Sequence, residues 1–161
     1  LTVLTRLALL TGELEYMNRA STLGQTFGNE ANRALNGAGG YLAGLEYVVN
    51  SLIILVIGHK GHTKTQELVR AFWSKPLPNA MLVQIEPGQP LPPQHPAAGR
   101  GMEGGHPTAY ICQAGSCSNP FTNAAELAWA LTLPPQLRAQ QQAQMQQPQQ
   151  QQQPSFQPAR F

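Results

Sequence analysis

Charged residues are scarce in this sequence. Asp, Glu, Lys and Arg make up 11% of the 161 residues, against about a quarter in an average soluble domain, and all eight acidic residues are Glu. The net charge is +2, and the Lys and Arg residues are spread along the chain without forming a basic stripe. Nucleic-acid binding requires clustered Lys and Arg. We therefore expect no nucleic-acid partner, and we expect another protein segment to cover part of the surface.

A membrane-spanning segment and a secretory signal are also lacking. The longest apolar run, Ser51 to Gly58 extended back through Tyr47, is interrupted by Asn50 and Ser51 and is too short to cross a bilayer. The first ten residues have no basic n-region and no small-residue cleavage site. We expect a soluble, cytoplasmic chain without a membrane partner. Because it starts with Leu1 rather than Met, we also expect it to be a fragment of a longer protein.

Composition divides the chain into three parts. Residues 134–161 are rich in Gln and Pro and cannot bury enough apolar surface to fold, so they are predicted to be a disordered tail. Residues 1–50 form a helical segment, and residues 51–133 form a small α/β subdomain. The predicted fold class is therefore α+β or α/β.

The first fifty residues have helical periodicity. Leu1, Leu4, Leu7 and Ala8 recur at helical spacing, and Thr11-Gly12 ends that helix. A second helix begins near Glu13 and runs toward Phe27, with Glu30 to Leu35 prolonging it or forming a separate turn. The glycine-rich stretch 36–40 breaks it, and a third helix follows over 41–49.

The period changes at Ser51. Leu52 to Ile57 is a continuous β-branched run, as expected for a strand buried on both faces. A helix capped by Thr63, with a buried side of Leu68, Val69, Phe72 and Trp73, leads to a second strand over 80–85. This order predicts a βαβ unit, followed by a long Pro/Gly-rich loop over 87–107.

Both cysteines fall in a predicted hairpin over 108–119. Thr108 to Cys112 forms one strand, Gln113 to Ser116 supplies a four-residue turn, and Cys117 begins the return. Facing cysteines in such a hairpin are close enough for a disulfide or a shared metal, and two reduced apolar cysteines remain an alternative. A short helix capped by Asn123 or Thr122 follows.

The remaining candidate sites give weak signals. Gly58 to Thr65 lies where a phosphate loop would be, but it fits neither the Walker A nor the dinucleotide-binding spacing. His59, His62 and His106 could join the cysteines in a zinc site, but they lie on separate loops. We therefore predict no metal, no cofactor and no CxxC redox motif.

The acidic residues of the helical segment offer no carboxylate pair for glycoside chemistry. Glu13, Glu15, Glu30 and Glu46 have solvent-facing spacing, whereas glycoside hydrolysis needs two acids across a cleft. We interpret them as solvated or helix-capping charges, and no catalytic residue is assigned.

Three segments taken together resemble a known family. They are Leu55–Gly58, Pro78–Val83 and 107–127, and the Tyr-Ile-Cys…Cys-Ser-x-Pro pattern of the last is the specific part. The combination resembles the C-terminal end of the thioredoxin-domain-containing family typified by spermatogenesis-associated protein 20. The resemblance covers roughly residues 1–133, and the helical start is similar to one hairpin of an (α/α) toroid.

The resemblance implies a thioredoxin-like module, then an (α/α) toroid similar to N-acylglucosamine 2-epimerases and six-hairpin glycosidases, and then this α/β tail. The module, its cysteine motif and most of the toroid would lie upstream, so no catalytic residue of the family can be carried onto this chain. The Gln-rich tail is not part of the family pattern.

Three functional hypotheses follow. The first is a C-terminal portion with a structural or interaction role and no catalysis of its own, whose partners are the thioredoxin-like module and the toroid helices. The second is a thiol redox or metal-binding module that uses Cys112 and Cys117. The third, which depends on the resemblance alone, is a part of a carbohydrate-acting toroid enzyme.

Overall fold

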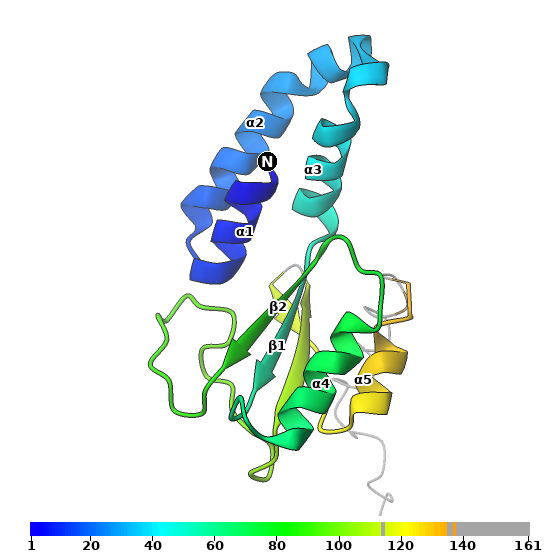
Figure 1. Ribbon diagram of the computed structural model, residues 1–161. Coiled ribbons are helices and arrows are strands. Elements are labelled where there is room, and N and C mark those ends of the chain that lie inside the picture. The colour runs from blue at the N-terminus through cyan, green and yellow to red at the C-terminus, as the bar shows by residue number, and fades with distance from the viewer. Residues whose placement is uncertain (114, 135–136, 138–161) are drawn as a thin grey trace, which may run out of the picture.

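A computed structural model describes residues 1–113, 115–134 and 137. The elements, in chain order, are α1 (Thr2–Thr11), α2 (Leu14–Arg33), the 3-10 helix η1 (Leu35–Gly37), α3 (Gly39–Asn50), β1 (Leu52–Ile57), α4 (Thr63–Trp73), β2 (Ala80–Ile85), β3 (Thr108–Gln113), β4 (Ser116–Cys117) and α5 (Ala124–Ala130). The first three α-helices form a layer at one end of the sheet (Figure 1).

The helix boundaries follow the glycine signals of the sequence. Gly12 ends α1 with a φ of 78°, a left-handed conformation that favours glycine, and its N–H donates to the carbonyl oxygen of Ala8 at 2.8 Å. The glycine-rich stretch separates α2 from α3, and α2 ends at Arg33. The three predicted helices are thus confirmed.

Small residues let the three helices approach closely. Ala20 and Gly24 of α2 and Gly44 of α3 are buried. A Cβ atom at Gly44 would lie 2.8 Å from Cβ of Leu1. Tyr41 adds a hydrogen bond from its hydroxyl to the carbonyl oxygen of Gly24. The contact between α1 and α3 therefore depends on the missing side chain at position 44.

Apolar side chains remain on the outside of this layer. Val3, Leu7 and Leu10 follow one another at i, i+4 and i+7 along α1 and are 70%, 36% and 44% exposed; we call them the outer face of α1. Thr5 and Ala8, on the opposite side, are buried. A helix that is apolar on both sides is normally covered on both sides.

The sheet contains four strands in the order β2-β1-β3-β4. β1 and β2 are parallel, with Leu52 opposite Ala80, and α4 connects them as the βαβ prediction requires. β1 and β3 are antiparallel, with Leu52 opposite Gln113. The chain is thus a mixed α and β fold built on a mixed sheet, and the sheet begins two residues after α3 ends.

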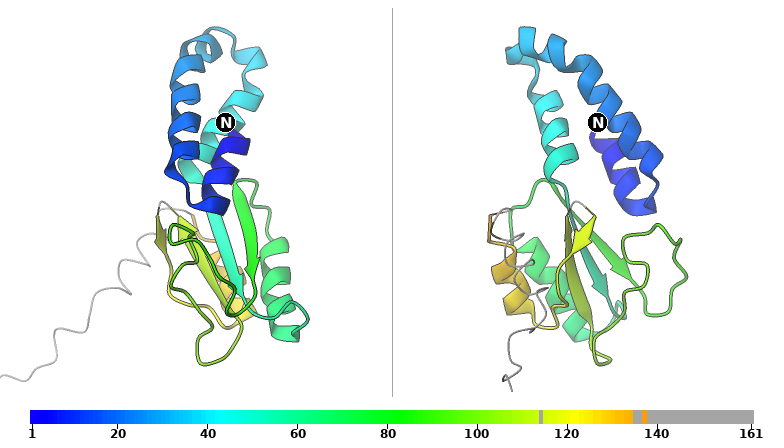
Figure 2. Two further views of the ribbon diagram at one scale, coloured as in Figure 1. Left: turned by 90° about the vertical axis from the view of Figure 1, so that its left-hand side faces the viewer. Right: turned by 180° about the vertical axis from the view of Figure 1, so that it is seen from behind.

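Both faces of the sheet are covered. All six residues of β1 are buried, which confirms the expectation for this strand. On one face the sheet packs against α4 and α5, and on the other it packs against the long loop over 87–107 (Figures 1 and 2). The first cluster includes Leu52, Ile54, Val56, Leu68, Phe72, Ile111 and Leu127. The second includes Ile53, Leu55, Ile57, Ile85, Ala97, Tyr110 and Cys112.

Two details of the helices differ from the sequence predictions. The N-cap of α4 is His62 rather than Thr63, because the imidazole Nδ1 accepts the Lys64 N–H at 3.3 Å. Trp73 is 70% exposed and does not join Phe72 in the core. For α5 the predicted cap is confirmed, since Asn123 accepts the N–H groups of Ala125 and Glu126.

The predicted disordered tail, 134–161, lies outside the described residues except for positions 134 and 137. Within the part of the chain that the structure describes, no helix is both long and apolar enough to cross a membrane.

Candidate functional site

The two cysteines face each other across the β3–β4 hairpin. Cys112 pairs with Cys117 and Gln113 with Ser116. The cysteines form a disulfide with an S–S distance of 2.00 Å and a Cα–Cα distance of 3.9 Å. Ile111 and Ser118, the neighbours of the cysteines away from the turn, are joined by two hydrogen bonds. The Ser118 N–H donates to the carbonyl oxygen of Ile111, and the Ile111 N–H donates to the Ser118 hydroxyl oxygen.

The hairpin turn is shorter than predicted. Strand pairing continues one residue past each cysteine, to Gln113 and Ser116, so two residues rather than four separate the strands. Gly115 has a φ of 79°, a left-handed value that occurs in two-residue hairpin loops and that glycine adopts without strain. The prediction missed this because it ended both strands at the cysteines.

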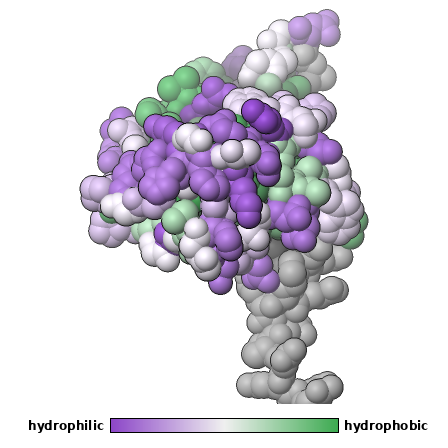
Figure 3. Space-filling model, turned by 60° about the horizontal axis from the view of Figure 1, so that its bottom comes forward, coloured by the Kyte–Doolittle hydropathy of each residue, from purple (hydrophilic) through white to green (hydrophobic). Residues whose placement is uncertain are grey.

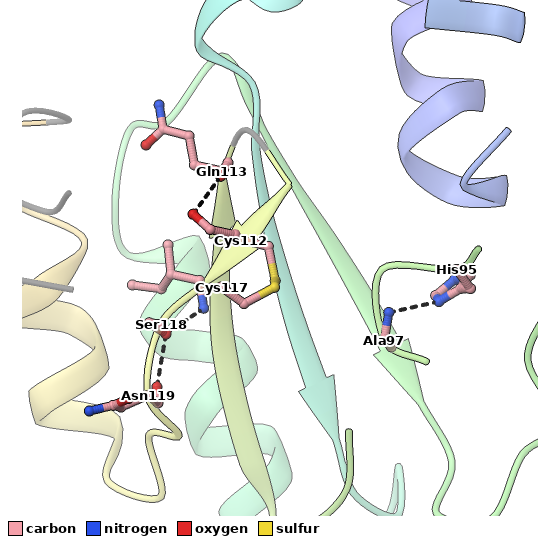
Figure 4. Close-up of a disulfide and its surroundings, with 9 residues drawn as sticks. His95, Ala97, Cys112, Gln113, Cys117, Ser118 and Asn119 are labelled. Atoms are coloured by element: carbon pink, nitrogen blue, oxygen red, sulfur yellow. Dashed lines mark hydrogen bonds between the residues drawn. A yellow bond between two sulfur atoms is a disulfide. The ribbon is translucent and has the colours of Figure 1, made fainter. Parts of the chain in front are cut away.

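The disulfide lines a pocket of about 380 Å³. Figure 4 shows the bridge projecting from the hairpin toward the side on which His95 and Ala97 lie. Other walls come from the junction of α1 and α2 and from the start of β1. The described residues that line it are Ala8, Leu9, Gly12, Glu13, Leu14, Met17, Ser51, Ile53, Gln94, His95, Pro96, Arg100, Cys112, Gln113, Gly115 and Cys117. Most of this lining is apolar, as is typical of small-molecule sites.

Gly12 holds the α1–α2 junction against the loop at this pocket. A Cβ atom at Gly12 would lie 2.0 Å from the carbonyl oxygen of Gln94. No side chain fits in that space, and the φ of 78° also disfavours one. The glycine that ends α1 therefore also sets how closely the helical layer approaches the loop.

Arg100 brings a cation to the pocket. Its guanidinium carbon lies 5.1 Å from the centre of the Tyr110 ring, a cation–π geometry. Its Nε atom is buried and has no hydrogen-bond partner among the described residues. The Tyr110 hydroxyl donates to the carbonyl oxygen of Gly101 at 2.9 Å, and burial raises the pKa of that phenol. A buried donor without a partner is uncommon in native proteins.

His95 supplies a second polar group. Its Nδ1 accepts the backbone N–H of Ala97 at 3.1 Å, which places the proton of the neutral ring on Nε2. Burial lowers the pKa of His95, because the interior disfavours the charged imidazolium. The ring is therefore a neutral donor at pH 7. Sequence reasoning missed both His95 and Arg100, since neither belongs to a motif and only folding of the loop brings them beside the cysteines.

The histidines considered as candidate metal ligands do not come together with the cysteines. His62 caps α4, and His106 pairs with Glu103 through an isolated antiparallel β-bridge of the backbone. His59 contacts Glu86 instead of a cysteine, with Nδ1 3.1 Å from the carboxylate. Among the described residues, no group of three or more His, Cys, Asp or Glu side chains is placed to hold a metal ion.

The turn after β1, where a phosphate loop would lie, is hydrogen-bonded to a carboxylate of the same chain. Glu86, just past β2, accepts the backbone N–H of Lys60 at 3.1 Å. That hydrogen bond, more than any other interaction, lowers the pKa of Glu86. The surface at this end of the sheet, where α4 begins, is mainly hydrophilic (Figure 3). The Glu86 carboxylate therefore already lies against the turn at which a phosphate would have to bind.

The four acids of the helical segment are exposed. Glu15 pairs with Arg19 and Glu30 with Arg33 along α2. Glu46 accepts a hydrogen bond from the Asn50 amide at 3.0 Å. These are local helix pairs of the kind that contribute a few tenths of a kcal/mol.

Comparisons of the chain with family models, curated proteins and solved structures found no match.

Proposed function

We propose that this chain is the C-terminal part of a thioredoxin-domain-containing protein of the spermatogenesis-associated protein 20 type. In this proposal it has a structural or interaction role and performs no catalysis alone. Its partners are the toroid helices and thioredoxin-like module of the same protein. The sequence resemblance motivates the proposal, and the exposed outer face of α1 is the observation that supports it best.

The outer face of α1 is what an inner helix of a larger helical layer would present. Val3, Leu7 and Leu10 are substantially exposed, and burying such a side chain fully contributes about 1.5–3 kcal/mol. Covering the three would stabilise the layer by several kcal/mol. Further apolar side chains are exposed on α2 and α3: Leu14, Leu23, Phe27, Leu42 and Val49.

Replacing the outer face of α1 tests this role. In the isolated chain, the triple variant Val3→Gln/Leu7→Gln/Leu10→Gln is expected to bind less hydrophobic dye and to self-associate less, while the chain still unfolds cooperatively because a substantial part of each side chain is exposed. Trp73→Gln is a control, since it removes from the α/β part an apolar side chain that is as exposed as Val3. It should leave most of the dye binding unchanged.

Two results would count against the proposal. One is a wild-type chain that is monomeric and binds no dye, because an uncovered apolar face would then have no consequence. The other is a triple variant that loses its fold, because the outer face would then be structural within this chain.

A second candidate function is thiol–disulfide exchange at Cys112 and Cys117. The observation that favours it is the position of the disulfide in the wall of a pocket, where a small molecule can reach it. Thiol titration before and after mild reduction tests it. We expect no free thiol before reduction and two after it; a bridge that resists reduction until the chain is denatured would rule this function out.

A further inference from the structure

We propose that the pocket beside the disulfide binds a small thiol that carries a carboxylate. This inference rests on the second candidate function and names the class of its substrate. The thiol would exchange with the Cys112–Cys117 bridge while its carboxylate is held by Arg100 and His95.

The pocket has the size and walls of a small-ligand site. Its volume of about 380 Å³ falls within the range of about 300–1,000 Å³ that is usual for such sites. Leu9, Met17 and Ile53 supply apolar parts of the wall that also contains the two cysteines. A ligand with a short apolar body between its thiol and its charged group matches this distribution.

Two hydrogen-bond donors favour an anionic group. Arg100 lines the pocket, and its buried Nε lacks a partner among the described residues. His95 lines the same pocket, with Nδ1 engaged by Ala97 and Nε2 carrying the proton. The guanidinium cation of Arg100 and the Nε2–H of His95 would both favour a carboxylate in the pocket, because hydrogen bonds to charged groups are stronger than those between neutral groups.

One acidic residue limits where the carboxylate lies. Glu13, at the N-cap of α2, is the acid in the described lining. It would repel a second carboxylate at the helical side of the pocket. The ligand carboxylate is therefore placed on the side of the loop that carries Arg100. If Glu13 dominated instead, a thiol with an amino group would be preferred, so the two cases can be separated.

The exchange step requires only the incoming thiol. Its thiolate attacks the sulfur of Cys117, which is less buried than Cys112. A new S–S bond forms between the ligand and Cys117 as the Cys112–Cys117 bond breaks, and the electron pair of that bond leaves as the Cys112 thiolate. The Arg100 cation in the same pocket favours that thiolate. The reverse reaction restores the bridge and releases the thiol.

Three small thiols of similar size, which differ in the charge of one end, test the proposal: 3-mercaptopropionate, 2-mercaptoethanol and cysteamine. The rate at which each opens the bridge is measured by mass spectrometry of the mixed disulfide and corrected for the thiolate concentration. The oxidised peptide 108–119 is the reference, because it has the same disulfide ring without the pocket. Relative to the peptide, the chain is expected to favour 3-mercaptopropionate by about tenfold or more.

Two arginine variants identify the source of this preference. Arg100→Gln should remove it, and Arg6→Gln should leave it unchanged. Arg6 is a matched control because its guanidinium also lies over a tyrosine ring, that of Tyr47, at 5.3 Å, but not in the pocket lining. If Arg100→Gln fails to fold, Arg100→Lys keeps the cation and should retain the preference.

The outcomes separate this inference from the function on which it rests. If no thiol opens the bridge in the folded chain while all open it in the peptide, thiol exchange itself is wrong. If all three open it in the same order as in the peptide, exchange stands and the carboxylate specificity is wrong. A preference for cysteamine would show that Glu13 selects a cation and would overturn the proposal.

Discussion

Reducing the Cys112–Cys117 bridge should lower stability by a modest and calculable amount. The cysteines are five positions apart, so the bridge closes a ring of only six residues. The chain-entropy relation gives about 2 kcal/mol for a ring of this size at 25 °C. Unfolding of an α/β unit of roughly 80 residues responds by about 4–8 °C for each kcal/mol. We therefore expect the melting temperature to fall by roughly 8–16 °C.

Thermal unfolding with and without dithiothreitol measures this effect. The double variant Cys112→Ala/Cys117→Ala is the control, because its melting temperature should match that of the reduced chain and should not respond to the reductant. Thiol titration must show two thiols per reduced chain. With that established, equal melting temperatures for the oxidised and reduced chains would refute the entropic reasoning. A fall far above this range would show that the bridge also supports the core around Cys112.

Three further changes test the packing and electrostatics. Leu127→Ala removes a fully buried side chain from the core under α5 and should cost about 2–5 kcal/mol in urea unfolding, whereas the exposed Trp129→Ala should cost under about 0.5 kcal/mol; similar values for both would contradict the packing. Gly44→Ala should destabilise by about 1–3 kcal/mol through its clash with α1, while Gly40→Ala, with open space around it, should stabilise by about 0.4–1 kcal/mol, and the opposite order would contradict the helix contact. Because the folded pKa of Glu86 lies below the ordinary glutamate value of 4.5, its contribution to folding stability is complete above that pH and is lost as pH falls through the folded pKa; melting curves between pH 3 and 6 should therefore be less acid-sensitive for Glu86→Gln, and unchanged sensitivity would contradict the shift.

Local signals in the sequence were sufficient to predict most elements. The β-branched run that begins at Leu52 indicates a buried strand. Gly12 and Asn123 mark helix ends, Gly12 through its backbone conformation and Asn123 through its side-chain hydrogen bonds. Trp73 was placed wrongly because helical periodicity assigns two adjacent residues to one face. Only Phe72 reaches the sheet, and Trp73 lies one position further around the helix.

The pocket could not be predicted in the same way. The cysteine pairing is a local property of a hairpin and was within reach of sequence reasoning. His95 and Arg100 are brought to it by a loop whose path depends on burial of Ala97 and on the approach of Gly12 to Gln94. These are contacts between segments far apart in the sequence, and no periodicity or motif records them.

Hydrogen–deuterium exchange of α1 tests most directly whether the helical layer packs against further helices. It should be compared between this chain and a protein extended upstream by the in-frame coding sequence. If the outer face of α1 is covered there, the α1 amides should exchange at least about tenfold more slowly in the longer protein, as expected for about 1.4 kcal/mol or more of added local stability. The β1 amides should change much less. Equal exchange of α1 in both proteins would contradict the proposed role.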